Sequence, residues 1–171
     1  MPRRLRYQVA ASLDGFIADP NGGYDWIVND PRIDFKALYR EFDTAVMGRK
    51  TYDLMQSLGA AVSMPGIEVV AFSRTLPPKS QMFRVLLDAG LVDTVEIAVM
   101  PVLLGAGIPV LPAGAMATLT LADQKILADS GIVMLAYTVK GSRAAPPRIR
   151  YIKPRTRKTK APKKNPSRRR R

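Results

Sequence analysis

The residues best placed to do chemistry are Gly48, Arg49, Lys50 and Thr51, which follow a short apolar run and precede a helical pattern. A glycine has no Cβ and lets the backbone approach an anion, and the first N–H groups of a helix lack partners within the helix. The helix dipole adds partial positive charge there, and the two cations and the Thr51 hydroxyl add donors. This layout can hold a phosphate. The alternative is an ordinary strand-to-helix turn with two solvated cations.

The elements that must position this turn follow from the hydrophobic pattern. Alternation predicts a first strand over Leu5–Ala11, followed by a loop rich in Gly, Asp and Asn over residues 12–26. Asp30 followed by Pro31 predicts a helix with Asp30 as its N-cap. Four apolar residues of this segment have helical spacing, and we expect their side chains to face the core: Phe35, Leu38, Tyr39 and Phe42.

The rest of the chain alternates between strand and helix patterns and then becomes all strand. Further strands are predicted at residues 44–47, 67–72, 94–99, 118–123 and 132–140, and helices at 51–58 and 80–87. Strands that alternate with helices early and follow one another late are typical of an α/β domain. We therefore expect a three-layer α/β fold, a mixed sheet with flanking helices.

Composition excludes several kinds of site. The chain has no cysteine and no histidine, so it cannot use a disulfide, a thiolate or the commonest metal ligand. Catalysis must use carboxylates, Tyr, Lys or a cofactor, and we expect no metal. No apolar run is long enough to span a membrane, and residues 1–6 lack the apolar segment of a signal peptide. These features predict a cytoplasmic protein with one core of ordinary size.

The net charge of +13 belongs to one end of the chain. Residues 141–171 hold fourteen Lys and Arg and no acidic residue, which leaves residues 1–140 with a net charge of −1. Apolar residues nearly vanish in the basic segment, so it cannot bury enough surface to offset the entropy of ordering. We expect a folded domain over residues 1–140 and a disordered basic tail over 141–171.

Four segments, taken in order, resemble the dihydrofolate reductase superfamily. They are Ala11–Ala18 (ASLDGFIA), Gly48–Tyr52 (GRKTY), Phe72–Leu76 (FSRTL) and Leu86–Gly107, which contains MPVLLGAG. The similarity is strongest to the C-terminal reductase domain of the bifunctional deaminase-reductase of bacterial riboflavin biosynthesis and to its stand-alone relatives. It covers residues 5–140 and implies an NADPH-binding reductase with a dihydrofolate-reductase-like fold.

The resemblance places substrate and nicotinamide at the end of the first strand. Asp14 would face the substrate heterocycle, either holding it by hydrogen bonds or helping to deliver a proton, and Ala11, Ile17 and Ala18 would line the nicotinamide site. The hydride is the cofactor's chemistry, so the protein mainly positions two rings. The alternatives are a turn aspartate that bonds its own loop and simple packing for the apolar residues.

The resemblance also divides the cofactor's phosphates between two turns. The turn Gly48–Thr51 would bind the pyrophosphate, with Thr51 at the helix start. Ser73 and Arg74 would bind the adenosine 2′-phosphate, for which the bidentate fork of arginine is well suited and which would favour NADPH over NADH. The alternative for Ser73-Arg74-Thr75 is a polar turn before two prolines.

One expected part of the family pattern is missing. After Leu76, relatives have a further helix, a buried central strand and a Gly-Gly pair against the pyrophosphate. Here Pro77–Ser80 runs directly into a segment that resembles the helix after that pair. About one βα unit, roughly 30 residues or more, is absent. We therefore expect a sheet without one inner strand and a pyrophosphate site without its second set of donors.

Three functions follow from these patterns. The first is an NADPH-dependent reductase of a pyrimidine- or pteridine-like ring, in its most specific form a 5-amino-6-(5-phosphoribosylamino)uracil reductase. The second is a catalytically impaired reductase-like scaffold whose basic residues 141–171 bind nucleic acid or another acidic partner. The alternative for this segment is a solubilising extension. The third is an inactive relative that keeps the fold to form a homodimer through its last strands.

Overall fold

The computed structural model describes residues 3–57, 59, 64, 66–72, 82–111, 113–114 and 116–141. Two predicted cofactor-binding residues, Ser73 and Arg74, lie outside the described residues, as does the basic segment from residue 142 onward. The elements are β1 (Arg6–Ser12), β2 (Phe16–Ala18), α1 (Phe35–Tyr39), β3 (Thr44–Gly48), α2 (Arg49–Ser57), β4 (Glu68–Phe72), α3 (Met82–Asp88), β5 (Thr94–Met100), β6 (Ile108–Pro109), β7 (Leu119–Leu127) and β8 (Ile132–Val139).

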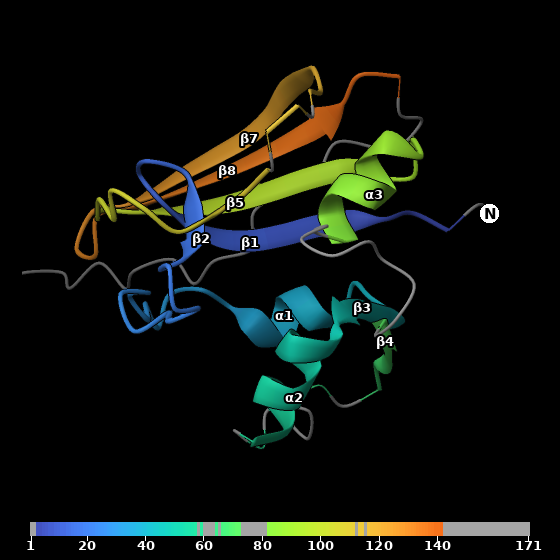
Figure 1. Cartoon of the computed structure of the whole chain (residues 1–171), viewed down its shortest axis with the longest axis horizontal. Coiled ribbons are helices and arrows are strands. Elements are labelled where there is room, and N and C mark those ends of the chain that lie inside the picture. The colour runs from blue at the N-terminus through green and yellow to red at the C-terminus, as the bar shows by residue number, and fades with distance from the viewer. Residues whose placement is uncertain are drawn as a thin grey trace, which may run out of the picture.

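The main sheet has four strands in the order β1-β5-β8-β7. β1 and β5 are parallel from Arg6↔Thr94 to Ser12↔Met100, and β8 is antiparallel to both β5 and β7. The parallel pair is connected through α1, α2 and α3, whereas β7 and β8 form a hairpin (Figure 1). The predicted α/β architecture with a mixed sheet is thus confirmed.

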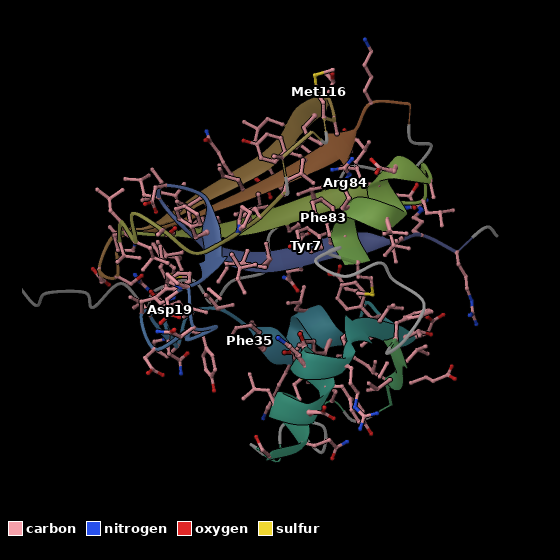
Figure 2. All side chains as sticks on the ribbon, in the orientation of Figure 1. Tyr7, Asp19, Phe35, Phe83, Arg84 and Met116 are labelled. Carbon is pink, nitrogen blue, oxygen red and sulfur yellow. The ribbon has the colours of Figure 1, made fainter. Side chains whose placement is uncertain are left out.

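Each face of the main sheet has its own core. On one face α3 packs over β1 and β5, with Phe83, Val92 and Val95 buried. The rings of Tyr7 and Phe83 stack there with centroids 3.6 Å apart and point toward one another in Figure 2. Burial raises the pKa of Tyr7 to about 12. The buried residues of the opposite face are Met100, Leu127 and Ile132, against which Trp26 and Ile33 pack.

The strands β3 and β4 form a second, parallel sheet that is separate from the first. They pair from Thr44↔Glu68 to Gly48↔Phe72, and α2 follows β3 directly (Figure 1). Within the described parts of the chain, neither strand pairs with β1, whose only strand partner is β5. Two short strands that share no ladder with the main sheet are the arrangement expected when an inner strand between β1 and β3 is lacking.

Several predicted boundaries are wrong, for local reasons. The helix predicted from Asp30 begins at Phe35, because Asp34 caps it through a 2.9 Å hydrogen bond from the Ala37 N–H. The Asp30 side chain instead accepts hydrogen bonds from Arg32 and Ser130. Phe35 does not face the core; it is 45% exposed, and this short helix buries Leu38.

Other boundaries shift less. The helix predicted from Thr51 begins at Arg49, so Arg49 and Lys50 lie in its first turn. The strand predicted over residues 118–123 continues to Leu127, where a tight turn leads into β8. α3 ends as predicted before Gly90, whose φ of 66° belongs to the left-handed region that favours glycine. No helix in the described ranges has the length and apolar character needed to cross a membrane.

Amide hydrogen exchange is expected to separate the two sheets. Among the strands that the structure describes, the pair β3–β4 has no third partner, and Ala71 and Phe72 are exposed, so the pair should open without global unfolding. We expect its protection factors to be about 100-fold or more below those of β5, which is paired on both sides. Hydrogen exchange followed by NMR or mass spectrometry measures the protection factors of the β3–β4 pair and of β5. Equal protection in β4 and β5 would show that the small sheet is held as firmly as the large one.

Candidate functional site

The end of β1 is joined to a loop about ninety residues later in the chain by the side chain of Asp14. Its carboxylate accepts hydrogen bonds from the Ser12 hydroxyl at 2.6 Å and from the backbone N–H groups of Leu104 at 3.1 Å and Gly105 at 2.7 Å. The Leu13 N–H donates to the carbonyl of Val102 at 2.8 Å beside them. Asp14 therefore bonds a distant loop, in addition to its own turn.

These hydrogen bonds favour the ionised form of Asp14. They lower its pKa, with the Ser12 hydroxyl as the largest cause and the two backbone N–H groups as further causes. The carboxylate is on the surface of the molecule, so a ligand can reach it. An ionised carboxylate accepts hydrogen bonds and donates none, which favours a holding role over proton delivery at neutral pH.

The three apolar residues predicted beside Asp14 lie on β1 and β2. Ala11 and Ala18 are buried, and Ile17 is half-buried. β2 pairs with β6, which follows the loop that contains Leu104 and Gly105. A Cβ at Gly107 would lie 2.2 Å from the Ala18 carbonyl oxygen, so only glycine lets the two segments approach this closely. The structure thus brings Ala11, Asp14 and Ala18 to one region at the end of β1.

The predicted phosphate turn is placed as a strand-to-helix junction. Gly48 ends β3 and Arg49 begins the nine-residue helix α2. Lys50 and Thr51 are exposed in its first turn. Arg49 also lies there, but its Nε donates to Asp53 at 2.7 Å, four residues further along the helix. Lys50, Thr51 and the first N–H groups of α2 are thus available to an anion.

A cavity that the sequence did not indicate lies against β1, β5 and β8. Its volume is about 300 Å³. The segment 27–35 forms one wall, and the opposite wall is the sheet face that carries Ala10, Ala98 and Met134. The polar residues that line it are Gln8, Asn29 and Glu96. The available signal was Glu96, a charged residue inside the otherwise uncharged strand Thr94–Met100.

Glu96 belongs to an ion-pair network around Arg6. The Arg6 guanidinium lies 3.1 Å from Glu96 and 3.0 Å from Glu41, and its carbon Cζ lies 4.8 Å from the centre of the Phe42 ring. Burial raises the pKa of Glu96, while the charge of Arg6 opposes that rise. Glu41 and Phe42 lie in the turn after α1, separated from β3 by Asp43, so Arg6 links the main sheet to the segment that enters the small sheet, and the described strands of the two sheets share no ladder.

The wall formed by residues 27–35 is anchored by Asp30. This buried carboxylate pairs with Arg32 and accepts a hydrogen bond from the Ser130 hydroxyl, both at 2.5 Å, and Arg32 also pairs with Asp129 at 2.7 Å. The hydrogen bonds from Arg32, and next that from Ser130, hold the pKa of Asp30 far below its usual range. Asp30 thereby fastens the segment to the turn between β7 and β8.

The sequence comparisons cover a small part of the chain. No model of a known protein family matches it. A stretch of 52 residues is 42% identical to the uncharacterised protein YyaP of Bacillus subtilis (strain 168). This stretch is 30% of the present chain and 28% of the Bacillus protein, so the match spans less than a third of that relative.

Solved structures match over most of the chain. A protein named for riboflavin biosynthesis from Shewanella sp. PV-4 aligns over 81% of this chain and 99% of its own, with a TM-score of 0.67 and 22% identity. A diaminohydroxyphosphoribosylaminopyrimidine deaminase/5-amino-6-(5-phosphoribosylamino)uracil reductase from Thermotoga maritima aligns over 80% of this chain and 56% of its own, with a TM-score of 0.56 and 14% identity.

A third similar structure is a dihydrofolate reductase from Enterococcus faecalis, solved as a complex with NADP(H). It aligns over 80% of this chain and 96% of its own, with a TM-score of 0.52 and 14% identity. These likenesses agree with the resemblance found in the sequence motifs. The chain has the dihydrofolate-reductase-like fold that the reductases of riboflavin biosynthesis share.

Proposed function

We propose that this chain is an NADPH-dependent reductase of a pyrimidine- or pteridine-like ring. The observation that carries the proposal is the placement of the two candidate binding sites on a reductase-like fold. Asp14 and its loop follow β1, and the turn Gly48–Thr51 follows β3, each at the carboxyl end of a parallel strand. Ligands of open α/β sheets bind outside the carboxyl ends of the strands.

The residues at the start of α2 are suited to bind the pyrophosphate of a dinucleotide. The first N–H groups of α2 with Lys50 and Thr51 would hold a phosphate of the pyrophosphate, because Lys50 and Thr51 are exposed and Asp53 pairs with Arg49 instead. Arg49 would join them by exchanging its contact with Asp53. Ser73 and Arg74 remain our proposal for the 2′-phosphate.

The chain's own contribution to the reaction is to bind and orient. When bound, the nicotinamide supplies the hydride. Ala11, Ile17 and Ala18 would line the nicotinamide site, and of the three the half-buried Ile17 offers the most side-chain surface to a flat ring, since both alanines are buried. Asp14, held in its ionised form, would accept hydrogen bonds from N–H groups of the substrate ring. The most specific substrate we propose is the phosphoribosylaminouracil named for the Thermotoga relative.

Cofactor binding is the direct test. We expect the full chain to bind NADPH, seen as a change in nicotinamide fluorescence, and Lys50→Ala or Thr51→Ala to weaken binding by about tenfold each through loss of a bond to a charged group. Lys36→Ala, which removes an exposed cation of α1, should leave affinity unchanged. An absence of binding at millimolar NADPH would rule out the reductase.

The second candidate function rests on the fourteen basic residues of segment 141–171. If this segment binds nucleic acid, a gel shift should weaken steeply with salt and vanish when residues 141–171 are deleted. The same deletion should leave NADPH binding intact if residues 1–140 form the reductase. Loss of NADPH binding on deletion would instead assign the basic segment to the cofactor site.

A further inference from the structure

The edge of β1 that faces away from β5 has backbone groups without a hydrogen-bond partner among the described residues. The Leu5 carbonyl accepts hydrogen bonds from the N–H groups of Asp93 at 2.9 Å and Thr94 at 3.3 Å, so Leu5 directs its backbone toward β5. Along a strand of a parallel ladder, successive residues direct their N–H and C=O groups to opposite sides. The residues whose backbone groups point away from β5, and bond no described residue, are Arg6, Gln8 and Ala10.

β1 is also the edge of the main sheet that is open to pairing. Its register with β5 runs from Arg6 to Ser12 without a bulge, and Gln8 in the middle of the strand is exposed. The other edge strand, β7, has an irregular register between Leu121 and Asp123, and bulges of this kind protect an edge against further strands. An added strand would therefore pair with β1 more readily than with β7.

The space beyond β1 favours one extended segment over a folded partner. In Figure 1, α1 and β3 lie on the side of β1 that faces away from β5. Arg6 holds them close, because its guanidinium lies 3.0 Å from Glu41 and 4.8 Å from the centre of the Phe42 ring. The small sheet thus lies across the approach to the open edge. A single strand needs only about 4.8 Å of width.

One segment of the basic tail has the sequence pattern of a strand. Residues 148–153 read RIRYIK, lie between Pro147 and Pro154, and alternate arginines with Ile149 and Tyr151. β-branched and aromatic residues favour strands. Beyond Pro154 the chain holds a single apolar residue, so this pattern distinguishes residues 148–153 from the part of the tail that follows them.

The segment can reach the open edge and run parallel to β1. Thr138 of β8 lies beside Thr94, and Thr94 lies beside Arg6, so the chain leaves β8 level with the start of β1. Two strand spacings separate β8 from β1, and a third leads to the open position, about 14 Å in all. The linking residues 142–147 span up to about 20 Å when extended.

The alternation of the segment matches the two faces of β1. Tyr7 lies on the face that α3 covers, whereas Gln8 lies on the face of Glu96. Ile149 and Tyr151 fit the face of Tyr7, where they would extend an apolar core. Tyr7 directs its backbone toward β5, and in parallel strands the residues of one face direct their backbones to the same side. Ile149 and Tyr151 would therefore donate their N–H groups to β1.

Charge favours the same orientation. It places Arg148 and Arg150 on the face where Arg6 is shared between Glu41 and Glu96, three side chains that together carry one excess negative charge. The Oε1 atom of Glu96 is buried and has no hydrogen bond among the described groups. The opposite orientation would place both arginines against the apolar core under α3, where a charge without a partner is costly.

We propose that residues 148–153 add to the main sheet as a parallel strand beside β1, in the inner position that the sequence predicts to lack its usual strand. The folded domain then includes part of the tail that composition alone assigns to disorder. The inference does not depend on reductase activity. The basic residues beyond Pro154 stay outside the sheet, so deleting residues 155–171 should leave it intact.

Amide hydrogen exchange of the full-length protein, followed by NMR, tests the pairing. The N–H groups of Arg6, Gln8 and Ala10 should exchange about 100-fold or more slowly than in an unstructured chain, because each would donate to the added strand. The N–H groups of Ile149 and Tyr151 should be protected as well. Exchange of either set at the rate of an unstructured chain would overturn the proposal.

Two proline variants identify the segment that covers the edge. Tyr151→Pro removes an N–H group that donates to β1 and should speed the exchange of Gln8 and Ala10 at least tenfold. Thr159→Pro, further along the tail, should leave it unchanged, and protection of Val95 in β5 shows that each variant is folded. Protection of Gln8 and Ala10 that persists in Tyr151→Pro, or that falls on dilution as a contact between two copies would, overturns the proposal. If Tyr151→Pro does not fold, the protection of Ile149 and Tyr151 in the unaltered protein still decides.

Discussion

Replacing Arg6 by methionine is expected to destabilise the protein by about 3–5 kcal/mol, the usual cost of removing one partner from a buried ion pair. Its side chain is 18% exposed and pairs with both Glu96 and Glu41. Methionine keeps the length of the side chain but leaves Glu96 buried without a compensating charge. It also removes the guanidinium from the Phe42 ring, a contact between the two sheets. Urea unfolding followed by circular dichroism measures the loss.

Two controls separate the charge from the packing. The double variant Arg6→Met, Glu96→Met should recover most of the lost stability, because a buried ion pair can often be replaced by apolar residues at little cost. Arg3→Met should change stability by less than about 1 kcal/mol, since its contact with Asp43 is 4.0 Å long and both side chains are largely exposed. A small effect of Arg6→Met alone would show that the sheets are held together by other contacts.

Asp14→Asn is expected to lower turnover by about 100-fold, with NADPH affinity retained, if the negative charge of Asp14 holds the substrate ring. Asparagine preserves one acceptor oxygen for the N–H groups of Leu104 and Gly105, so the loop should keep its place. Steady-state kinetics with NADPH and an aminouracil or pteridine substrate measure the change. NADPH titration of the same variant provides the control.

Asp14→Ala completes the comparison. Alanine removes the charge and every acceptor of this side chain, so the loop 102–105 should lose the hydrogen bonds of Leu104 and Gly105 and keep only the backbone bond between the Leu13 N–H and the Val102 carbonyl. If Asp14 acts only by positioning the loop, Asp14→Asn should retain turnover and Asp14→Ala should lose it. If both variants turn over normally, Asp14 has no part in the reaction.

Much of the secondary structure could be predicted from local pattern. The alternation around Tyr7 and Val9 located β1, and the glycine after Met47 located the junction of β3 and α2. Both depend on a few neighbouring residues, whose side chains point to alternate faces of a strand or follow one another around a helix. The predicted start of α1 is wrong because the local sequence makes Asp30 and Asp34 equally suitable N-caps. In the fold Asp30 is held by Arg32 and by Ser130, a hundred residues away, and Asp34 caps the helix.

The lack of an inner strand remains a prediction, made because the motifs on either side of it are present in order. What the pattern left open was whether the neighbouring strands would close the gap. In the described residues β1 keeps β5 as its strand partner, and β3 and β4 pair with each other. Local pattern does not carry this information, since strand pairing depends on contacts between residues far apart in the sequence.

The sequence by itself therefore determined the order of the elements, the strand-to-helix turn at Gly48–Thr51 and the likeness to dihydrofolate reductases. Only the tertiary structure decided that Asp14 bonds Leu104 and Gly105, that Arg6 ties the small sheet to the large one, and that Glu96 lines a cavity. The physical reason is the same in each case. Propensity, capping and periodicity act over a few residues, whereas a buried charge obtains its partners and its pKa from side chains that folding alone brings together.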